Sequence, residues 1–224
     1  MKNRIVDLVG SLWREVLGGL IVVSLVGVWD YIHNEVPLAV RLIGIGIFAA
    51  IVIGIFLRAT RTRKVLVYVS AGGTCRDPMA KAITDQLLAQ RQLKYPVDVR
   101  AIGLQPAGEG GASYGARYAI KKLYNADLLK DHRPTAFTDR LIREATLILV
   151  MDHNLFKATE NTLPGSKTYV FKEFFGQSGD IADPYRKSGE RGPETEKRYE
   201  DCANELKQIL SSNIDKLLQR LEAA

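Results

Sequence analysis

A short loop near residue 70 combines residue types that bind phosphate groups. Residues 70–74 are small or carry a hydroxyl group, they follow an apolar run at 65–69, and Arg76 and Pro78 come next. Pro suits the first turn of a helix, so the loop leads into a helix start whose N–H groups and dipole attract an anion. Arg76 adds a two-pronged donor for a phosphate-like oxyanion. The pattern indicates an anion-binding loop, and an ordinary strand-to-helix turn is the alternative.

The loop resembles the phosphate-binding loop of the low-molecular-weight protein tyrosine phosphatases, a family that includes protein arginine phosphatase-like members. The family loop reads Cys-x5-Arg-Ser-Pro-Met-Ala, and the matching positions are Arg76, Pro78, Met79 and Ala80. Cys75 matches a second cysteine that many members carry just before the arginine. The resemblance implies a phosphate-binding set formed by Ala71, Gly72, Gly73, Thr74, Cys75 and Arg76.

Three loop positions depart from the family pattern. Ser70 stands where the family has its nucleophilic cysteine, Gly73 where it has an asparagine, and Asp77 where it has a hydroxyl residue. A serine hydroxyl ionises far above neutral pH, and no basic neighbour is evident in the sequence, so we expect an inactive enzyme. The preferred interpretation is an engineered Cys-to-Ser inactivation, and natural loss of the nucleophile is the alternative. We expect Asp77 to cap the helix and to point away from the ligand.

Three further segments resemble the family, in the family's order and as far as the C-terminus. They are residues 112–138, 145–152 and 180–185. The last segment contains Asp183 and Tyr185, and it resembles the loop that supplies the family's general acid. The resemblance therefore implies Asp183 as the acid, Tyr185 as a wall of the substrate pocket, and a reaction that needs neither a metal nor a cofactor.

The resemblance implies a phosphoprotein phosphatase, with phosphotyrosine as the preferred substrate. Thr74 and residues 179–185 resemble the arginine phosphatase members, so phosphoarginine is a lesser alternative. A natural pseudophosphatase that binds a phosphorylated or nucleotide ligand, as a sensor or scaffold, is the other class of function. The 31 Lys and Arg residues exceed the 25 Asp and Glu, but they form no long block and no nucleic-acid motif appears. We therefore expect no nucleic-acid partner.

The order of elements predicts an α/β domain over residues 61–224. Short apolar runs alternate with helical stretches, which is typical of a parallel sheet with helices on both faces. The expected strands are residues 65–69, 97–104, 146–151 and 167–171, and the expected helices are 78–93, 115–124, 135–144 and 194–221. The resemblance implies a flavodoxin-like fold, in which ligands bind beyond the carboxyl ends of the strands.

Residues 1–60 have a different character from the rest of the chain. Two apolar runs, at 17–28 and 42–57, reach the length of about 20 residues that a span needs only with their amphipathic edges. Basic residues crowd the outer ends of both runs, and the link between them is acidic. We therefore expect a two-helix transmembrane hairpin in the cell membrane, with the N-terminus and the C-terminal domain in the cytoplasm. A re-entrant or interfacial hairpin is the alternative.

Small residues follow one face of the second apolar run. Gly46, Ala50 and Gly54 are four residues apart, and such a face lets two helix backbones approach closely. We expect this face to pack against the first helix or against another copy of the chain. The expected partners are thus the membrane, a phosphorylated protein or other phosphate ligand, and a second copy of the chain.

Overall fold

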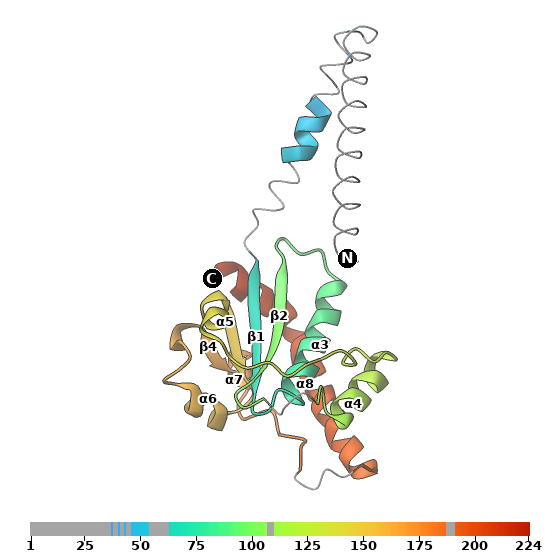
Figure 1. The fold of residues 1–224 in the computed structure, drawn as a ribbon, viewed down its shortest axis with the longest axis vertical. Helices are drawn as coiled ribbons and strands as arrows, with labels where there is room; N and C mark the ends of the chain where they lie inside the picture. Colours follow the sequence, from blue (N-terminus) through green and yellow to red (C-terminus); the bar gives the residue numbers. More distant parts are fainter. Residues whose placement is uncertain are drawn as a thin grey trace, which may run out of the picture. The chain divides into compact units, whose positions relative to one another are not determined.

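The computed structural model describes residues 63–106, 110–186 and 191–224, together with Pro37, Val40, Ile43 and residues 46–53. The chain divides into two compact units, Met1–Arg61 and Thr62–Ala224, which we call the first and the second unit. The strands of the described residues all belong to the second unit (Figure 1).

Four parallel strands form the centre of the second unit (Figure 1). They are β1 (Lys64–Ser70), β2 (Val97–Gly103), β3 (Leu147–Val150) and β4 (Thr168–Val170). Their order in the sheet is β2-β1-β3-β4, so β1 lies inside the sheet and the loop after it opens at the carboxyl edge. The predicted parallel α/β sheet is confirmed, and its strand order is that of flavodoxin-like folds.

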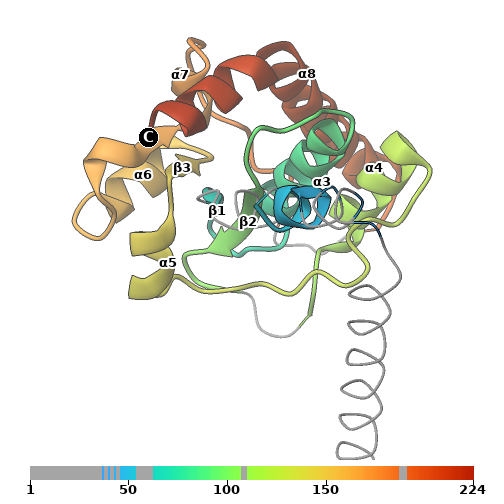
Figure 2. The same ribbon diagram turned by 90° about the horizontal axis from the view of Figure 1, so that it is seen from above.

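Helices cover both faces of this sheet (Figure 2). One face carries α3 (Arg76–Ala89), α4 (Tyr114–Tyr124) and α8 (Pro193–Ala223). The other carries α5 (Asp139–Glu144) and α6 (His153–Thr159). A 3-10 turn, η1 (Gly165–Lys167), precedes β4, and the short α7 (Phe171–Phe174) follows it. The helix layers explain why β3 is apolar at every position, because both of its faces are buried.

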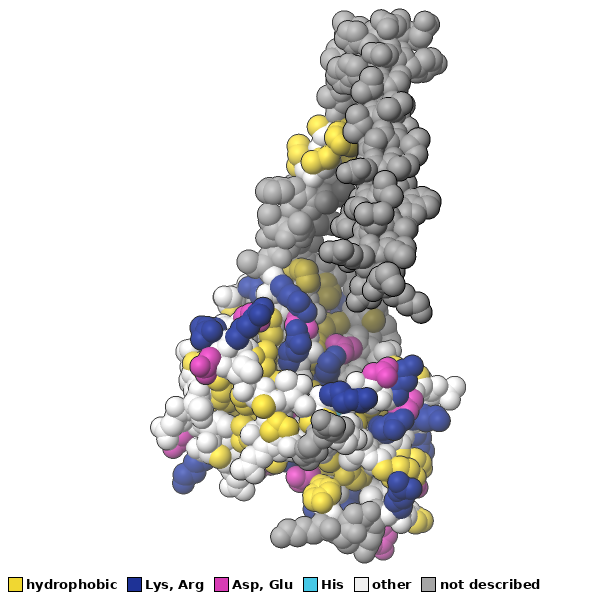
Figure 3. Space-filling view, viewed as in Figure 1, with side chains coloured by type: hydrophobic (Ala, Val, Ile, Leu, Met, Phe, Trp, Pro, Cys, Tyr) yellow, Lys and Arg dark blue, Asp and Glu magenta, His cyan; other side chains and the backbone are white. Residues whose placement is uncertain are grey.

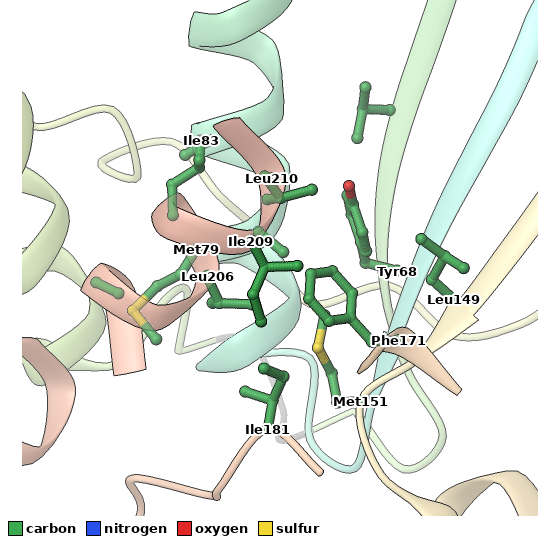
Figure 4. Close-up of a cluster of buried hydrophobic side chains, with 14 of the residues drawn as sticks. Tyr68, Met79, Ile83, Leu149, Met151, Phe171, Ile181, Leu206, Ile209 and Leu210 are labelled. Carbon is green, nitrogen blue, oxygen red and sulfur yellow. The ribbon is translucent and has the colours of Figure 1, made fainter. Parts of the chain in front are cut away.

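Alternation along β1 sends its side chains into two separate cores. On the α3 and α8 side, Leu66 and Tyr68 join a large cluster that includes Met79, Phe171 and Leu210 (Figure 4). The smaller cluster on the α5 and α6 side contains Val65, Val67, Val69, Ile148, Val150, Leu141 and Phe156. Because both faces of β1 are packed, the position of the loop that follows it is fixed by the core.

Two helices, α5 and α6, differ clearly from the sequence prediction. The helix expected from residue 135 begins at Asp139, because the Thr138 hydroxyl accepts a hydrogen bond from the Leu141 N–H and caps it there. The helix α6 is not predicted at all, since it is short and has little apolar periodicity. Asp152 starts it by accepting a hydrogen bond from the Leu155 N–H.

In the first unit, residues 46–53 are helical and carry exposed apolar side chains (Figure 3). The exposed ones are Ile47, Phe48, Ile51, Val52 and Ile53. Within the described residues, no helix has both the length and the hydropathy of a membrane span. Most of the predicted hairpin, Gly54 included, lies outside the described residues, whereas Gly46 and Ala50 lie one turn apart on the described helix.

Candidate functional site

The loop after β1 lines a pocket of about 320 Å³ at the carboxyl edge of the sheet. The lining residues are Ser70, Ala71, Gly72, Thr74, Cys75, Arg76, Gln105, Asp183 and Tyr185. Every site residue expected from the sequence lines this pocket except Gly73, which belongs to the same loop. The structure thus brings together two segments that lie more than a hundred residues apart in the chain.

The loop is held tightly against the end of β2. Gly73 has a φ of +72°, in the left-handed region that favours glycine, and a Cβ on Gly103 would lie 2.7 Å from the Gly73 nitrogen. The Leu104 N–H donates to the Ser70 carbonyl at 3.0 Å, and the His132 Nε2 donates to the Gly73 carbonyl at 2.7 Å. Burial lowers the pKa of His132, so this ring is a neutral support for the loop.

The loop N–H groups are available to an anion. Those of Gly72, Thr74 and Cys75 have no hydrogen-bond acceptor in the part of the chain that the structure describes. The same loop ends at the first turn of α3, whose N-cap residue, Cys75, makes no side-chain capping bond. Free N–H groups at a helix start attract an oxyanion through hydrogen bonds and the helix dipole.

Arg76 is the charged centre of the site, and its side chain is almost fully buried. Its Nη1 donates to Asp152 Oδ2 at 2.7 Å and to the Ile181 carbonyl at 2.9 Å. Its Nη2 donates to Asp183 Oδ2 at 3.2 Å. The Asp152 side chain is 15% exposed, and that of Asp183 is 44% exposed. Asp152 therefore fixes the guanidinium, while Asp183 is the partner that a ligand anion displaces more easily.

The segment that carries Asp183 is anchored under the sheet edge. Ile181 is fully buried beside Met151 (Figure 4), and its N–H donates to the Met151 carbonyl at 3.0 Å. Asp183 Oδ1 accepts a hydrogen bond from the Tyr185 N–H at 3.1 Å. Tyr185 is 53% exposed and lines the pocket, where its ring is free to contact a substrate.

Asp180, the other acidic residue of this segment, is hydrogen-bonded to His153. Its Oδ1 accepts hydrogen bonds from the backbone N–H of His153 at 3.0 Å and from the ring Nδ1 at 2.6 Å. The ring Nε2 lies 2.9 Å from Glu173 Oε1. Hydrogen bonds to Glu173 and Asp180 raise the pKa of His153. Asp180 thus ties the acid-bearing segment to α6 and does not line the pocket.

Ser70 and Asp77 form a short hydrogen bond beneath the pocket, with 2.5 Å between Ser70 Oγ and Asp77 Oδ1. Asp77 does not line the pocket, which agrees with the expectation that it points away from the ligand. The expected capping of α3 is wrong, because the carboxylate of Asp77 is hydrogen-bonded to Ser70 instead. Burial raises the pKa of Asp77 to about 7, although the Ser70 hydroxyl and Arg76 oppose this shift. The other oxygen, Oδ2, has no partner among the described residues. Sequence reasoning finds no base near Ser70, since only the folded loop brings this carboxylate to it.

The two cysteines take part in packing. Cys75 Sγ lies 3.3 Å from the Tyr199 hydroxyl on α8 and 3.4 Å from Ser113 Oγ at the start of α4. Burial raises the pKa of Tyr199 above its usual range, so its hydroxyl stays protonated. Burial likewise raises the pKa of Cys202 to about 12. The expected contribution of Cys75 to phosphate binding is therefore limited to its backbone N–H.

Two residues of the site were not found from the sequence: Gln105, which lines the pocket, and Asp152, which pairs with Arg76. Asp152 directly follows the apolar run that forms β3, and Gln105 follows the end of β2. Both lie at the carboxyl edge of the sheet, and polar residues just after a parallel strand are the signal that points to them. In the described residues, no cluster of three or more His, Cys, Asp or Glu side chains is arranged to hold a metal ion.

Comparisons with known proteins identify a family that covers most of the chain. The family model described as "Low molecular weight phosphotyrosine protein phosphatase" matches residues 65–223. A protein-arginine-phosphatase of Bacillus subtilis (strain 168) is 26% identical over 151 residues, which are 66% of this chain and 97% of that relative.

Solved structures are similar over the same region. The crystal structure of a low molecular weight protein tyrosine phosphatase from T. tengcongensis matches with a TM-score of 0.59 and 28% identity, over 68% of this chain and 99% of that one. A Cys-to-Ser mutant of the YwlE arginine phosphatase, with a phosphorylated active-site serine, matches with a TM-score of 0.58 and 26% identity. That match covers 70% of this chain and 95% of the mutant.

The raised pKa of Asp77 predicts a specific pH dependence of stability. The folded protein holds this proton more tightly than the unfolded chain, whose carboxyl has a pKa of 3.8, so stability falls as the pH rises from about 4 to about 7. Asp77→Asn removes this loss of stability, so the variant should be more stable than the wild type by on the order of 4 kcal/mol at pH 8. Denaturant unfolding at pH 4 and pH 8 checks this, and an equal difference at both values contradicts it.

Proposed function

The chain belongs to the low molecular weight phosphotyrosine protein phosphatase family, and we propose that its second unit binds the phosphoryl groups of phosphorylated proteins in the loop from Ser70 to Arg76. The observation that carries this proposal is the joint arrangement of Arg76 and the loop. A buried guanidinium, loop N–H groups without acceptors and an uncapped helix start all border one pocket. These are the groups that hold a tetrahedral oxyanion.

Asp183 is positioned to act as the general acid of such a site. Its carboxylate reaches Arg76 from the pocket side and is partly exposed, so a ligand oxyanion can replace it on the guanidinium. An acid released beside the bound phosphoryl group is well placed to protonate the leaving oxygen. Asp152 keeps Arg76 in place during this exchange, because its own contact with Nη1 is shorter and more buried.

Ser70 takes the nucleophile position in this proposal. The phosphorylated active-site serine of the YwlE mutant supports it, because a serine in a similar fold accepts a phosphoryl group. The contact with Asp77 argues that Ser70 is the natural residue and not an engineered replacement. A carboxylate at 2.5 Å would disfavour the thiolate of a cysteine at this position, whereas a serine hydroxyl satisfies it. Hydrolytic turnover should nevertheless be far slower than with a thiolate nucleophile.

We propose phosphotyrosine as the first substrate to test, with Tyr185 as a wall that contacts the aromatic ring. Phosphoarginine is the lesser alternative. It is supported by Thr74 and by the similarity to the Bacillus subtilis protein-arginine-phosphatase.

A phosphate-binding pseudophosphatase is the second candidate function. The observation that favours it is Ser70 itself, because replacing the thiol removes the usual nucleophile but leaves Arg76 and the loop N–H groups intact. In this case the pocket binds a phosphorylated or nucleotide ligand without turnover, and the chain acts as a sensor or scaffold. Activity measurements separate the two candidates.

We further propose that residues 1–60 anchor the chain in the cell membrane as a two-helix hairpin, with the second unit in the cytoplasm. The exposed apolar side chains of residues 46–53 support this, as does the apolar composition of both runs (Figure 3). Gly46 and Ala50 have small side chains on one face of that helix. A Cβ on Gly46 would meet no atom within 4 Å, so this part of the face is open. This face suits close packing with another helix, including that of a second copy.

Restoring the family's nucleophile should create a phosphatase. Ser70→Cys/Asp77→Ser gives the introduced thiol a hydroxyl neighbour in place of a carboxylate, so we expect hydrolysis of an aryl phosphate to rise by orders of magnitude over the wild type. Ser70→Cys alone should gain less, because Asp77 opposes the thiolate. Adding Arg76→Ala should cost at least about 10²-fold. A folded double variant that hydrolyses neither aryl phosphate nor phosphoarginine would refute the enzyme reading.

The anchor is tested by solubility and topology. The full chain should remain in the membrane fraction until detergent is added, and removal of residues 1–60 should release a soluble protein, because the apolar runs are then absent. In sealed inside-out vesicles, added protease should digest the second unit. Solubility of the full chain without detergent, or protection of the second unit in those vesicles, contradicts the hairpin.

A further inference from the structure

We propose that Asp77 is the proton acceptor that makes Ser70 a working nucleophile, so that the chain takes a phosphoryl group from its substrate and keeps it as phosphoserine. This inference rests on the proposed phosphate-binding function, and it assigns a role to the residue that departs from the family pattern just after the arginine. It also accounts for the joint presence of a serine and a buried carboxylate in one loop.

The geometry aims the hydroxyl proton of Ser70 at Asp77. Ser70 Oγ donates to Asp77 Oδ1 at 2.5 Å, and the Gly73 N–H approaches the same Oγ from the loop at 3.4 Å. A hydroxyl has one proton, so the lone pairs of Oγ are left for the loop and the pocket. Ser70 lines the pocket, while Asp77 is fully buried and does not. The acceptor therefore lies behind the nucleophile, on the side away from an incoming phosphoryl group.

No other base in the described residues takes this position. His132 donates its Nε2 proton to the Gly73 carbonyl, so its ring is committed to the loop backbone. Asp183 and Asp152 are both paired with Arg76. Asp77 Oδ2 also supports a functional role, because it is buried and has no hydrogen-bond partner among the described residues. Such an oxygen costs free energy, and packing alone does not explain why it is kept.

The environment also suits Asp77 to accept a proton near neutral pH. The charged groups near it are Arg76 and Asp183, and Asp152 acts through Arg76. Burial outweighs the favourable contacts and makes this carboxylate more basic than an ordinary aspartate. A general base is most effective when its pKa lies near the working pH, which holds for a carboxyl that titrates near 7.

The proposed step forms one bond to phosphorus, breaks another and moves two protons. Ser70 Oγ forms a bond to phosphorus while its proton moves to Asp77 Oδ1. The bond between phosphorus and the leaving oxygen breaks, and the protonated carboxyl of Asp183 gives that oxygen its proton. Arg76 and the loop N–H groups hold the three remaining phosphoryl oxygens. The products are phosphorylated Ser70 and the dephosphorylated substrate. The phosphoserine persists, because a serine alkoxide is a much poorer leaving group than a thiolate.

The test uses the full chain in detergent with an aryl phosphate as the phosphoryl donor. The readout is the rate at which Ser70 gains a phosphoryl group, followed by intact mass and peptide mapping. Asp77→Asn keeps the size of the side chain and removes the base, so phosphorylation should slow by about 10²- to 10⁴-fold. Binding of inorganic phosphate should stay as tight or become tighter, since a nearby negative charge is removed. Asp85→Asn, a matched change on the same helix, should leave the rate unchanged.

The pH profile separates a base from a merely structural carboxylate. The wild-type rate should rise as the pH approaches 7 and Asp77 loses its proton, and this rise should be absent in Asp77→Asn. If Asp77→Asn does not fold, the same rates are measured on Asp77→Ser and compared with the pH profile of the wild type. Equal rates in wild type and Asp77→Asn overturn the inference, and so does a wild type that binds phosphate without forming phosphoserine. Failure of the wild type to bind phosphate instead overturns the proposed function.

Discussion

The site depends on one buried charge, the guanidinium of Arg76. An unpaired charge in this position would be very costly, so the surrounding structure supplies a carboxylate on each side and a backbone carbonyl. Asp152 comes from the end of β3 and Asp183 from the segment before α8, so the pairing joins three distant parts of the chain. The same charge gives the pocket its attraction for anions. The ion pairs that stabilise the buried Arg76 therefore also position it for anion binding.

The second constraint is the close approach of the loop to β2. A side chain on Gly103 would collide with the Gly73 backbone, and the neighbouring hydrogen bonds engage loop carbonyls. The loop carbonyls thus accept hydrogen bonds from neighbouring segments, whereas several loop N–H groups have no acceptor and can bind a ligand. His132 supports the loop from the same side. These contacts fix the position of the loop, so that Ser70 and Asp77 remain in hydrogen-bond contact.

Much of the fold follows from the sequence, because alternating apolar runs and helical stretches fix a parallel sheet, and the residues after β1 must lie at its carboxyl edge. Arg76, Asp183 and Tyr185 are expected from motif resemblance, and the structure brings them to one pocket. The hydrogen bond between Ser70 and Asp77 cannot be predicted from the sequence, because it depends on the path of the loop and the first helical turn over residues 70–77. The same holds for α6, whose start depends on a single capping carboxylate.

The central claim is that the loop from Ser70 to Arg76 is an oxyanion site, and backbone amide NMR of the full chain during titration with inorganic phosphate tests it most directly. We predict saturable shifts of the amides of residues 71–76, together with the side-chain signals of Arg76, and their loss in Arg76→Ala. Unchanged signals of residues 71–76 at millimolar phosphate, in a protein that is otherwise folded, would contradict the account.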